Sequence, residues 1–483
     1  MAGSTRRRLW IASAATAAVV LPLGFFWQQS LLPDSYDMAT MGAVDWGGGP
    51  IDEHAGMAGM EGVAVADLTA DPTATPAVSE TLTVHVDDGD YTVNGMSPGP
   101  LLEATEGDLV EVTLVNDHVA DGITLHWHGV DVPNAADGVA GVTQDAVAPG
   151  EELVYRFVAD QVGTFWYHSH QLSHEQVQGG LLGALVIHPA EPDPAGAGAD
   201  VDEVALVHRY DAGSTINGEL GTSTLPAEAG DEVRLRLVNT DNGLTSAWVT
   251  GAEFRVVAVD GTDLVGPQAV TGQSVRVPAG GRVDLAFVVP DEGVRIDFSA
   301  GTTLVVGADP TGTRPEKPRQ VVDLLSYGEP ADLGFDPSSP DRVFDYSIGK
   351  RPGFLDGRPG LWWTVNGKLF PDTPMYMVEE GDVVVFRIEN GSDDTHPMHL
   401  HGHHAVVLSK DGEPATGSPW WVDSLEVGVG ETYEIALLAD NPGIWMDHCH
   451  NLPHAAEGLV AHLMYAGVTS SYRVGGQLGN QPE

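Results

Sequence analysis

The sequence predicts an all-β protein made of three consecutive β-sandwich or barrel domains. Its 483 residues are enough for about three domains of ordinary size. The chain holds 59 glycines and 32 prolines, and its apolar residues occur in short valine-rich runs of period two rather than in long helical patterns. The same ordered set of turn and strand features also occurs three times along the chain.

Each repeat begins with an Asn-Gly pair and continues with a Gly-Asp pair that opens an alternating strand ending in asparagine. A second glycine-led strand then follows. The three sets are Asn94-Gly95, Gly107-Asp108, Asn116 and Gly150; Asn217-Gly218, Gly230-Asp231, Asn239 and Gly281; and Asn366-Gly367, Gly381-Asp382, Asn390 and Gly430. We therefore expect domains at residues 78–195, 200–328 and 340–468, with a linker rich in Pro, Ala, Gly and Asp at residues 189–202.

Residues 1–30 are typical of an export signal or a single membrane anchor. Arg6-Arg7-Arg8 precede an apolar stretch from Leu9 to Trp27, and no clean Ala-x-Ala cleavage site follows it. The arginines also resemble a twin-arginine signal, which exports proteins already folded around a cofactor. We expect the body of the protein outside the cytoplasm, secreted or at the cell surface.

Residues 31–77 have weak periodicity and many small residues, which predicts a flexible tether. This segment contains several soft sulfur ligands and one imidazole. They are Met38, Met41, Met57, Met60 and His54. Thioethers could bind or deliver Cu(I) there, or the segment could be a plain linker.

The formal net charge is -47, from 69 acidic and 22 basic residues. Such a surface repels nucleic acid and anionic membranes, so both are excluded as partners of the body. The acidic, lysine-poor composition fits either a high-salt habitat or an acidic patch for a cationic substrate.

Histidine and cysteine carry the functional information in this sequence. Cys449 is the single cysteine, so the chain has no intrachain disulfide. Of the 19 histidines, ten fall into four tight clusters, and none lies between His208 and His396. The clusters are His126-Trp127-His128, His168-Ser169-His170, His396-Pro397-Met398-His399-Leu400-His401, and His448-Cys449-His450 with His454.

In an extended strand, residues i and i+2 face the same side, so each His-x-His pair places two imidazoles next to each other. Four pairs supply eight nitrogen ligands, which indicates several metal ions. A thiolate with two imidazoles is typical of a blue copper site, and His396, Cys449 and His454 provide that set. His448 and His450 flank the same cysteine, which ties this site to the other histidines.

The segments HWHG, HSH, HPMHLH and HCHNLPHAAEGL resemble the four copper motifs of the three-domain multicopper oxidases, such as laccases. The resemblance covers about residues 80–468 and implies three cupredoxin-like Greek-key domains. It also implies four copper ions, namely one type 1, one type 2 and two type 3 ions, with the last three lying between the first and third domains. The second domain would act as a spacer.

The resemblance implies one ligand set for each ion. The sets are His396, Cys449 and His454 for type 1; His126 and His399 for type 2; His128, His168 and His450 for one type 3 ion; and His170, His401 and His448 for the other. The axial type 1 position falls on Leu459, which cannot coordinate, and this predicts a fairly strong oxidant.

The reduction of dioxygen requires protons, so we expect a carboxylate near the cluster. Asp137 matches the position of such an acid in similar bacterial enzymes, although Asp137-Gly138 could simply stabilise a turn. Many bacterial members carry a glutamate directly after the last type 1 histidine. Ala455 stands there in this chain, and Glu457 is a weaker candidate.

The resemblance implies one-electron oxidation of a reductant at the type 1 copper, transfer through Cys449 to His448 and His450, and reduction of dioxygen to water. The reductant is either a phenol or aromatic amine, as for a laccase, or Cu(I) or Fe(II), as for a metallo-oxidase. The methionine-bearing tether and the acidic surface favour metal ions, whereas the lack of a methionine-rich insertion between His401 and His448 favours phenols. A non-catalytic copper-binding protein is the alternative from another class.

Overall fold

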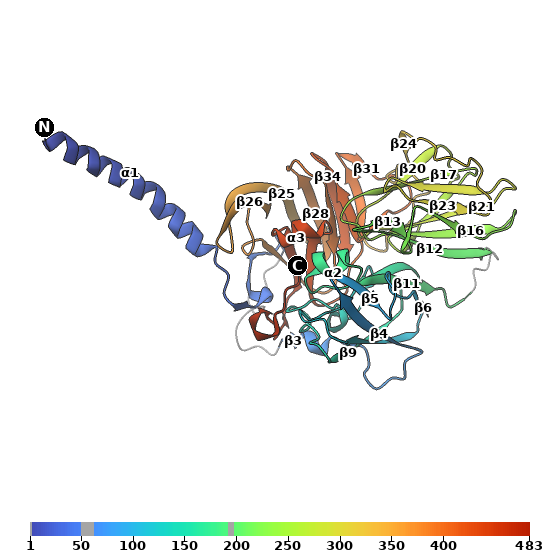
Figure 1. The fold of residues 1–483 in the computed structure, drawn as a ribbon, viewed down its shortest axis with the longest axis horizontal. Helices are drawn as coiled ribbons and strands as arrows, with labels where there is room; N and C mark the ends of the chain where they lie inside the picture. Colours follow the sequence, from blue (N-terminus) through green and yellow to red (C-terminus); the bar gives the residue numbers. More distant parts are fainter. Residues whose placement is uncertain (1, 50–61, 192–197) are drawn as a thin grey trace.

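The computed structural model describes residues 2–49, 62–191 and 198–483. Almost all of its regular structure is β, in three pairs of sheets that follow one another along the chain. In Figure 1 the first pair lies below, the second to the right and the third at the top centre, so all three meet in the middle of the molecule. The all-β prediction is confirmed.

The first domain contains two four-stranded sheets, ordered β5-β4-β7-β9 and β6-β11-β10-β8. Alternating apolar residues of β4, β7 and β9 face the space between the sheets, where they form one core. Its elements are β4 (Val78–Asp87), β5 (Asp90–Val93), β6 (Leu102–Thr105), β7 (Leu109–Asn116), β8 (His126–His128), η3 (Asn134–Ala136), β9 (Glu152–Val158), β10 (Gly163–His168), α2 (Ser173–Gln178) and β11 (Leu182–His188).

The second domain contains a seven-stranded sheet, β14-β13-β12-β16-β21-β18-β19, and a six-stranded sheet, β15-β23-β22-β17-β20-β24. Its elements are β12 (Val201–Tyr210), β13 (Gly213–Ile216), β14 (Glu219–Leu220), β15 (Thr222–Leu225), β16 (Glu232–Asn239), β17 (Thr245–Thr250), β18 (Arg255–Val259), β19 (Thr262–Asp263), β20 (Gln273–Val277), β21 (Arg282–Val288), β22 (Val294–Phe298), β23 (Thr303–Val306) and β24 (Gln320–Val321).

The third domain contains the sheets β26-β25-β28-β34-β30-β31, with β32 also paired to β30, and β2-β27-β36-β35-β29-β33. Its elements are β25 (Arg342–Leu355), β26 (Arg358–Val365), β27 (Pro374–Val378), β28 (Val383–Asn390), β29 (His396–Leu400), β30 (Ala405–Lys410), β31 (Glu413–Pro414), β32 (Trp421–Val422), β33 (Ser424–Val427), β34 (Thr432–Leu438), β35 (Ile444–Cys449), α3 (Leu452–Ala456) and β36 (Val460–Tyr465).

The repeats found in the sequence correspond to one repeated sheet pattern. In each domain a long strand pairs antiparallel with the next strand of its hairpin and parallel with the strand that follows the Gly-Asp pair. These triplets are β5-β4-β7, β13-β12-β16 and β26-β25-β28. The asparagine that ends the third strand is fully buried in every domain, and its side-chain amide donates to backbone carbonyls of neighbouring loops. The repeated asparagine therefore stabilises equivalent loops in all three domains.

The structure differs from the flexible tether expected for residues 31–77 in the two parts of this segment that it describes, 31–49 and 62–77. Strand β1 (Ser35–Tyr36) pairs with β38 (Val474–Gly475), β2 (Ala43–Asp45) joins a sheet of the third domain, and β3 (Val63–Ala64) pairs with β37 (Val468–Thr469). Short 3-10 turns lie beside them, namely η1 (Met38–Thr40), η2 (Val65–Asp67) and, near the end of the chain, η4 (Gly476–Leu478). Met38 is buried against the core, so it acts as a packing residue. Met57, Met60 and His54 lie outside the described residues.

Helix α1 (Ala2–Gln29) projects from the body next to the β25–β26 hairpin (Figure 1). Residues Arg7–Gln29 are long and apolar enough to cross a membrane, a property that signal sequences share. The segment after the helix is fixed to the hairpin turn, because Gly357 N donates to Ser30 Oγ at 3.2 Å and Leu32 N donates to Asp356 Oδ1 at 3.2 Å.

We expect the substitution Asn239→Ala to lower the free energy of unfolding by about 2–4 kcal/mol, because it leaves buried carbonyls without a donor. Asn239 Nδ2 lies 2.9 Å from the carbonyl oxygens of Gly243, Val277 and Pro278. Guanidinium unfolding measures the effect. The control Thr222→Ala, at an exposed position of the same domain, should change the value by less than about 0.5 kcal/mol. Equal effects of both substitutions would contradict this role of Asn239.

Candidate metal centre

Four groups of metal-ligating side chains are assembled from the four sequence clusters. Within each group the ligand atoms lie within 4.8 Å of one another, and every member is buried. The groups are His126, His399 and His401; His128, His168 and His450; His170, His401 and His448; and His396, Cys449 and His454. The structure therefore brings together all eleven predicted ligands.

The elements explain why these side chains converge. His126 and His128 lie on β8, which pairs with β10 and places His126 opposite His168. In the third domain β29 pairs with β35 and places His399 opposite His448. Since β8 and β29 belong to different domains, the contact between His126 and His399, whose Nε2 atoms are 3.4 Å apart, closes the site across the domain boundary.

Hydrogen bonds fix the tautomers of several rings in this buried histidine cluster. The Nδ1 atoms of His126, His168, His170 and His399 each lie 2.9 Å from a backbone carbonyl, which can only accept. The hydrogen therefore resides on Nδ1, and the lone pair of Nε2 points toward the cluster.

The inward nitrogens are suited to metal ions. The Nε2 atoms of His168, His170 and His450 are buried without a hydrogen-bond partner among the described residues. The Nε2 atoms of His401 and His448 face each other at 3.2 Å. Burial lowers the pKa values of His168, His170, His399, His401 and His450 well below the usual histidine value, so the rings stay neutral. Neutral imidazoles with opposed lone pairs need a cation between them.

The fourth group lies next to this cluster and contains the only thiol. Cys449 Sγ is 3.6 Å from His396 Nδ1 and 3.7 Å from His454 Nδ1, and the two Nδ1 atoms are 3.3 Å apart. Burial lowers the pKa of His396 to about 3 and raises that of the Cys449 thiol. Leu459 is fully buried, and its carbonyl accepts from Cys449 N at 3.2 Å.

Trp363 is a contact of the fourth group that the sequence did not indicate. Its ring packs against His396 and His454 at centroid distances of 4.5 and 4.4 Å, and Lys350 Nζ lies 3.6 Å from its centroid on the β25–β26 hairpin. Trp363 Nε1 donates to Glu457 Oε2 at 3.0 Å. Glu457 therefore binds the tryptophan that packs against the two imidazoles of the fourth group.

Asp137 contacts the buried histidine cluster directly. Its Oδ1 lies 3.1 Å from His126 Nδ1 and 3.0 Å from His401 Nδ1, whereas its Oδ2 is buried without a partner among the described residues. Burial raises the pKa of this carboxyl group. The side chain thus joins ligands from two domains. The adjacent Gly138 has a φ of +82°, and a Cβ there would meet Leu125 O at 1.7 Å, so the turn itself also depends on this Asp-Gly pair.

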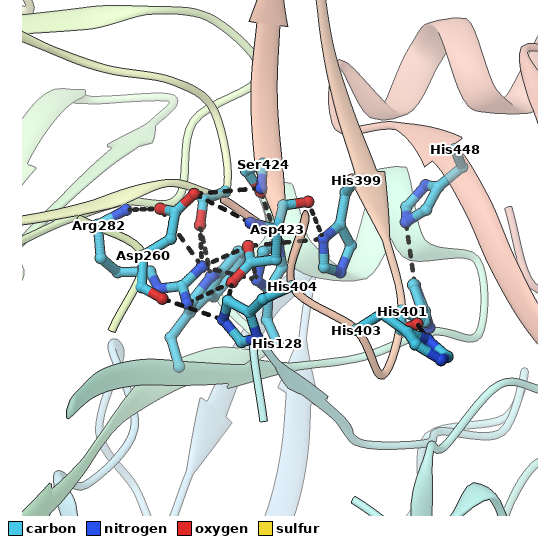
Figure 2. A network of polar contacts seen from close by, with 12 residues as sticks. His128, Asp260, Arg282, His399, His401, His403, His404, Asp423, Ser424 and His448 are labelled. Atoms are coloured by element: carbon cyan, nitrogen blue, oxygen red, sulfur yellow. Dashed lines mark hydrogen bonds and ion pairs between the residues drawn. The ribbon is translucent and has the colours of Figure 1, made fainter. Parts of the chain in front are cut away.

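The second domain contributes a charged network that sequence reasoning missed. Arg282 on β21 donates to both carboxylate oxygens of Asp423, at 2.6 and 2.5 Å, and is fully buried. Asp423 O accepts from His399 Nδ1, and Arg282 Nη1 lies 3.4 Å from His128 Nδ1. Figure 2 shows Asp423 with Arg282, Asp260 and His404 on one side and His399 on the other. The second domain, expected to be a spacer, therefore supports ligands of both other domains.

His404 completes the network as a second cation. Burial opposes its charge, but the carboxylates of Asp131 and Asp423, at 3.4 and 3.3 Å, raise the pKa of His404 to about 10. Arg282 and His404 in turn overcome burial and hold the pKa of Asp423 well below its usual range. The buried charges are thus paired.

The end of the described chain also contacts the histidine cluster. Pro482 O accepts from His170 Nδ1 at 2.9 Å, and Glu483 Oε1 lies 2.9 Å from His448 Nδ1. Ser173 Oγ donates to Glu483 Oε2 at 2.6 Å. These residues follow the third predicted domain and carry no ligand motif, so the sequence did not indicate them. Glu483 is therefore a carboxylate beside the cluster that the sequence did not predict.

Together, the fold and the site define a protein of three β-sandwich domains with three groups of metal ligands between its first and third domains and a fourth within the third domain. Two models described as multicopper oxidase match residues 79–192 and 337–467, together just over half of the chain. The chain belongs to the multicopper oxidase family of copper enzymes, and its three domains are cupredoxin domains.

Similar proteins include laccases and bacterial multicopper oxidases. Multicopper oxidase MmcO of Mycobacterium tuberculosis is 26% identical over 85% of this chain and 91% of its own. Laccase-1 of Botryotinia fuckeliana is 28% identical over 76% of each chain. The crystal structure of a multicopper oxidase from Pseudomonas thermotolerans, 28% identical, matches 81% of this chain and 100% of its own with a TM-score of 0.63.

We expect Arg282→Met to lower the free energy of unfolding by about 3–5 kcal/mol, because Asp423 loses its fully buried cation. It should also reduce the copper content of the purified protein, since His399 and His128 lose their support. Metal analysis and guanidinium unfolding provide the two measurements. The control Arg276→Met removes a half-exposed arginine 3.7 Å from Glu426 and should cost less than about 1 kcal/mol with no loss of copper. Unchanged copper content in the Arg282 variant would refute the support of the ligands.

Proposed function

We propose that this multicopper oxidase couples four one-electron oxidations of a reducing substrate to the reduction of dioxygen to two waters, in the manner of a laccase. The observation that carries the proposal is the position of Cys449, the last residue of β35, directly between His448 and His450 in the chain. Cys449 belongs to the group formed with His396 and His454, and its two neighbours belong to the buried histidine cluster. Three consecutive residues thereby link the two centres through covalent bonds.

We assign the four groups of ligands to four copper ions. The ion held by the group that contains Cys449 would supply a one-electron couple, and the ions in the buried histidine cluster would supply a dioxygen-binding centre. The assignment is type 1 at His396, Cys449 and His454; type 2 at His126 and His399; one type 3 ion at His128, His168 and His450; and the other at His170, His401 and His448. His401 also lies near the type 2 group. Leu459 would be the non-coordinating axial residue, which favours a strongly oxidising type 1 site.

His454 is the side chain through which we expect electrons to enter. Its side chain is 12% exposed, whereas His396 is fully buried. From the type 1 site, Cys449 connects to His448 and His450 through the peptide bonds on either side of it. Tight packing of Trp363 on both type 1 imidazoles keeps water away from the site and holds the rings in place.

Asp137 is the residue that we propose for proton transfer at the cluster. Burial raises the pKa of this carboxyl group, so it holds a proton more readily than an exposed aspartate does. Its second oxygen, which has no partner among the described residues, is available for that proton. The contacts of Asp137 with His126 and His401 also orient these two rings.

We propose phenols or aromatic amines as the reductants, since the chain is similar to proteins named laccases. One observation favours the second candidate, oxidation of Fe(II) or Cu(I). Asp394 Oδ2 lies 3.6 Å from Nε2 of His454, and the Asp394 side chain is 53% exposed. A carboxylate at the electron-entry edge would attract a cation.

We further propose that the protein works outside the cytoplasm. The apolar stretch of α1 follows Arg6-Arg7-Arg8, an arrangement that fits a twin-arginine export signal or an uncleaved anchor. Export in the folded state would suit a protein whose metal ions are enclosed between domains.

The substitution Cys449→Ser should abolish both the blue colour and the oxidation of substrate, because the serine hydroxyl cannot replace the thiolate at the type 1 site. The variant should retain three copper ions per chain, since no other group uses this side chain. Metal analysis, visible absorption and oxygen uptake are measured on the same preparation. Substrate oxidation at the wild-type rate would overturn the electron-entry assignment.

The substitution Asp394→Asn distinguishes the two kinds of reductant. If a metal ion is the substrate, the variant should lose roughly tenfold or more of kcat/KM for Fe(II), whereas the value for a methoxyphenol should stay within about twofold. The matched control is Asp393→Asn, which removes a neighbouring carboxylate that is 88% exposed and 3.8 Å from Lys350. A wild-type enzyme that oxidises phenols but shows no turnover of Fe(II) or Cu(I) would exclude the metallo-oxidase.

A further inference from the structure

A second kind of metal-ligating cluster lies on the surface of the first domain, apart from the copper groups. It consists of His85, Asp117 and His118, whose ligand atoms all lie within 4.8 Å of one another. His85 is on β4, and the other two residues directly follow β7. Strands β4 and β7 are parallel with Val84 opposite Asn116, so this register brings His85 next to Asp117.

The distances within the cluster fit metal coordination. Asp117 Oδ2 is 3.3 Å from His85 Nδ1 and 3.1 Å from His118 Nδ1. Charge-assisted hydrogen bonds between such groups are usually shorter, at about 2.7–2.9 Å. In a tetrahedral zinc site with bonds of about 2.0–2.1 Å, neighbouring ligand atoms are about 3.3–3.4 Å apart. The separation of 3.3 Å matches the second value, and that of 3.1 Å lies midway between the two.

The orientation of His118 also indicates a cation. Its Nε2 lies 3.3 Å from Val86 O, and a carbonyl oxygen can only accept. In the neutral ring the hydrogen is therefore on Nε2, and the lone pair of Nδ1 points at the Asp117 carboxylate. Two acceptors then face each other. A metal ion bound by both satisfies them, and so does a second proton on the ring.

The backbone holds these side chains in place without any metal. Asp117 N donates to Val84 O at 3.2 Å, which fixes the start of the loop to β4. The fully buried Asn116 fixes the other side, because its Oδ1 accepts from Val119 N at 2.7 Å and its Nδ2 donates to Val119 O at 2.9 Å. The site is preorganised on two paired strands, which reduces the entropy lost on binding.

We propose that His85, Asp117 and His118 form a surface site for a divalent metal ion of the Zn(II) or Cu(II) class. Two imidazole nitrogens and one carboxylate oxygen suit these ions, and the exposed position leaves room for water as a fourth ligand. Three carboxylates in the turn that follows His85, those of Asp87, Asp88 and Asp90, raise the local concentration of cations. The site is independent of the proposed oxidase activity.

Equilibrium dialysis of the copper-loaded full-length protein against Zn(II) tests the proposal. An excess of Mg(II) occupies sites made only of carboxylates, because this ion prefers oxygen ligands. The wild type should bind one equivalent of zinc while it retains its copper. The double variant His85→Ala/His118→Ala should bind none, and Asp117→Asn should bind zinc at least tenfold more weakly.

The matched control is His188→Ala, which removes an exposed histidine paired with a single carboxylate, that of Glu103, at 3.0 Å. This control should still bind one zinc ion. No zinc bound by the wild type, or equal binding by the wild type and the double variant, would overturn the site and leave a protonated His118 as the explanation of the geometry.

Discussion

The structure depends on one constraint, namely that neutral imidazole nitrogens are buried with their lone pairs facing one another. The opposed Nε2 atoms of His401 and His448, at 3.2 Å, and of His126 and His399, at 3.4 Å, would repel each other without a cation between them. Backbone carbonyls hold several of these rings in that tautomer from outside. The fold thus holds the lone pairs in a repulsive arrangement, and the binding of metal ions supplies the free energy that compensates for this repulsion.

This constraint explains why three domains are needed. Two cupredoxin domains supply the imidazoles, and neither can complete the buried histidine cluster alone, since each of its three groups contains residues of both domains. The second domain adds Arg282, which neutralises Asp423 where that residue contacts His399. The bidentate pair places a buried charge of each sign at the junction, and its cost would be prohibitive if either partner were missing. The domain without ligands therefore stabilises the position of the ligands.

Much of this arrangement could be predicted from the sequence, because its signals are local. Asn94, Asn217 and Asn366 adopt the same left-handed conformation, with φ of 51–52°, and hold the same hairpins, so the repeat in the sequence corresponds directly to the repeat in the fold. His126 and His128 both lie on β8, where a spacing of two fixes the facing side, and the other three His-x-His pairs each begin on a strand and end just beyond it. The metal groups follow from these strands once the domains meet.

The remaining features depend on contacts between distant segments, which no local pattern reveals. Nothing in the sequence distinguishes Arg282 from the other arginines. It is buried because the second domain packs against the first and third domains, where Arg282 contacts Thr164 and Asp423. Residues 31–49 and 62–77 have weak periodicity, yet short edge strands fix much of them to the body. Glu483 reaches His448 because the end of the described chain returns to the first domain, where Leu172 N donates to Gln481 O.

We propose that eleven side chains hold four copper ions in two neighbouring centres. Anomalous diffraction from crystals of the copper-loaded protein, measured on both sides of the copper absorption edge, locates these ions. We expect four copper peaks per chain, one enclosed by His396, Cys449 and His454 and three within the buried histidine cluster. Fewer peaks at these positions in a protein that actively reduces dioxygen would contradict this proposal.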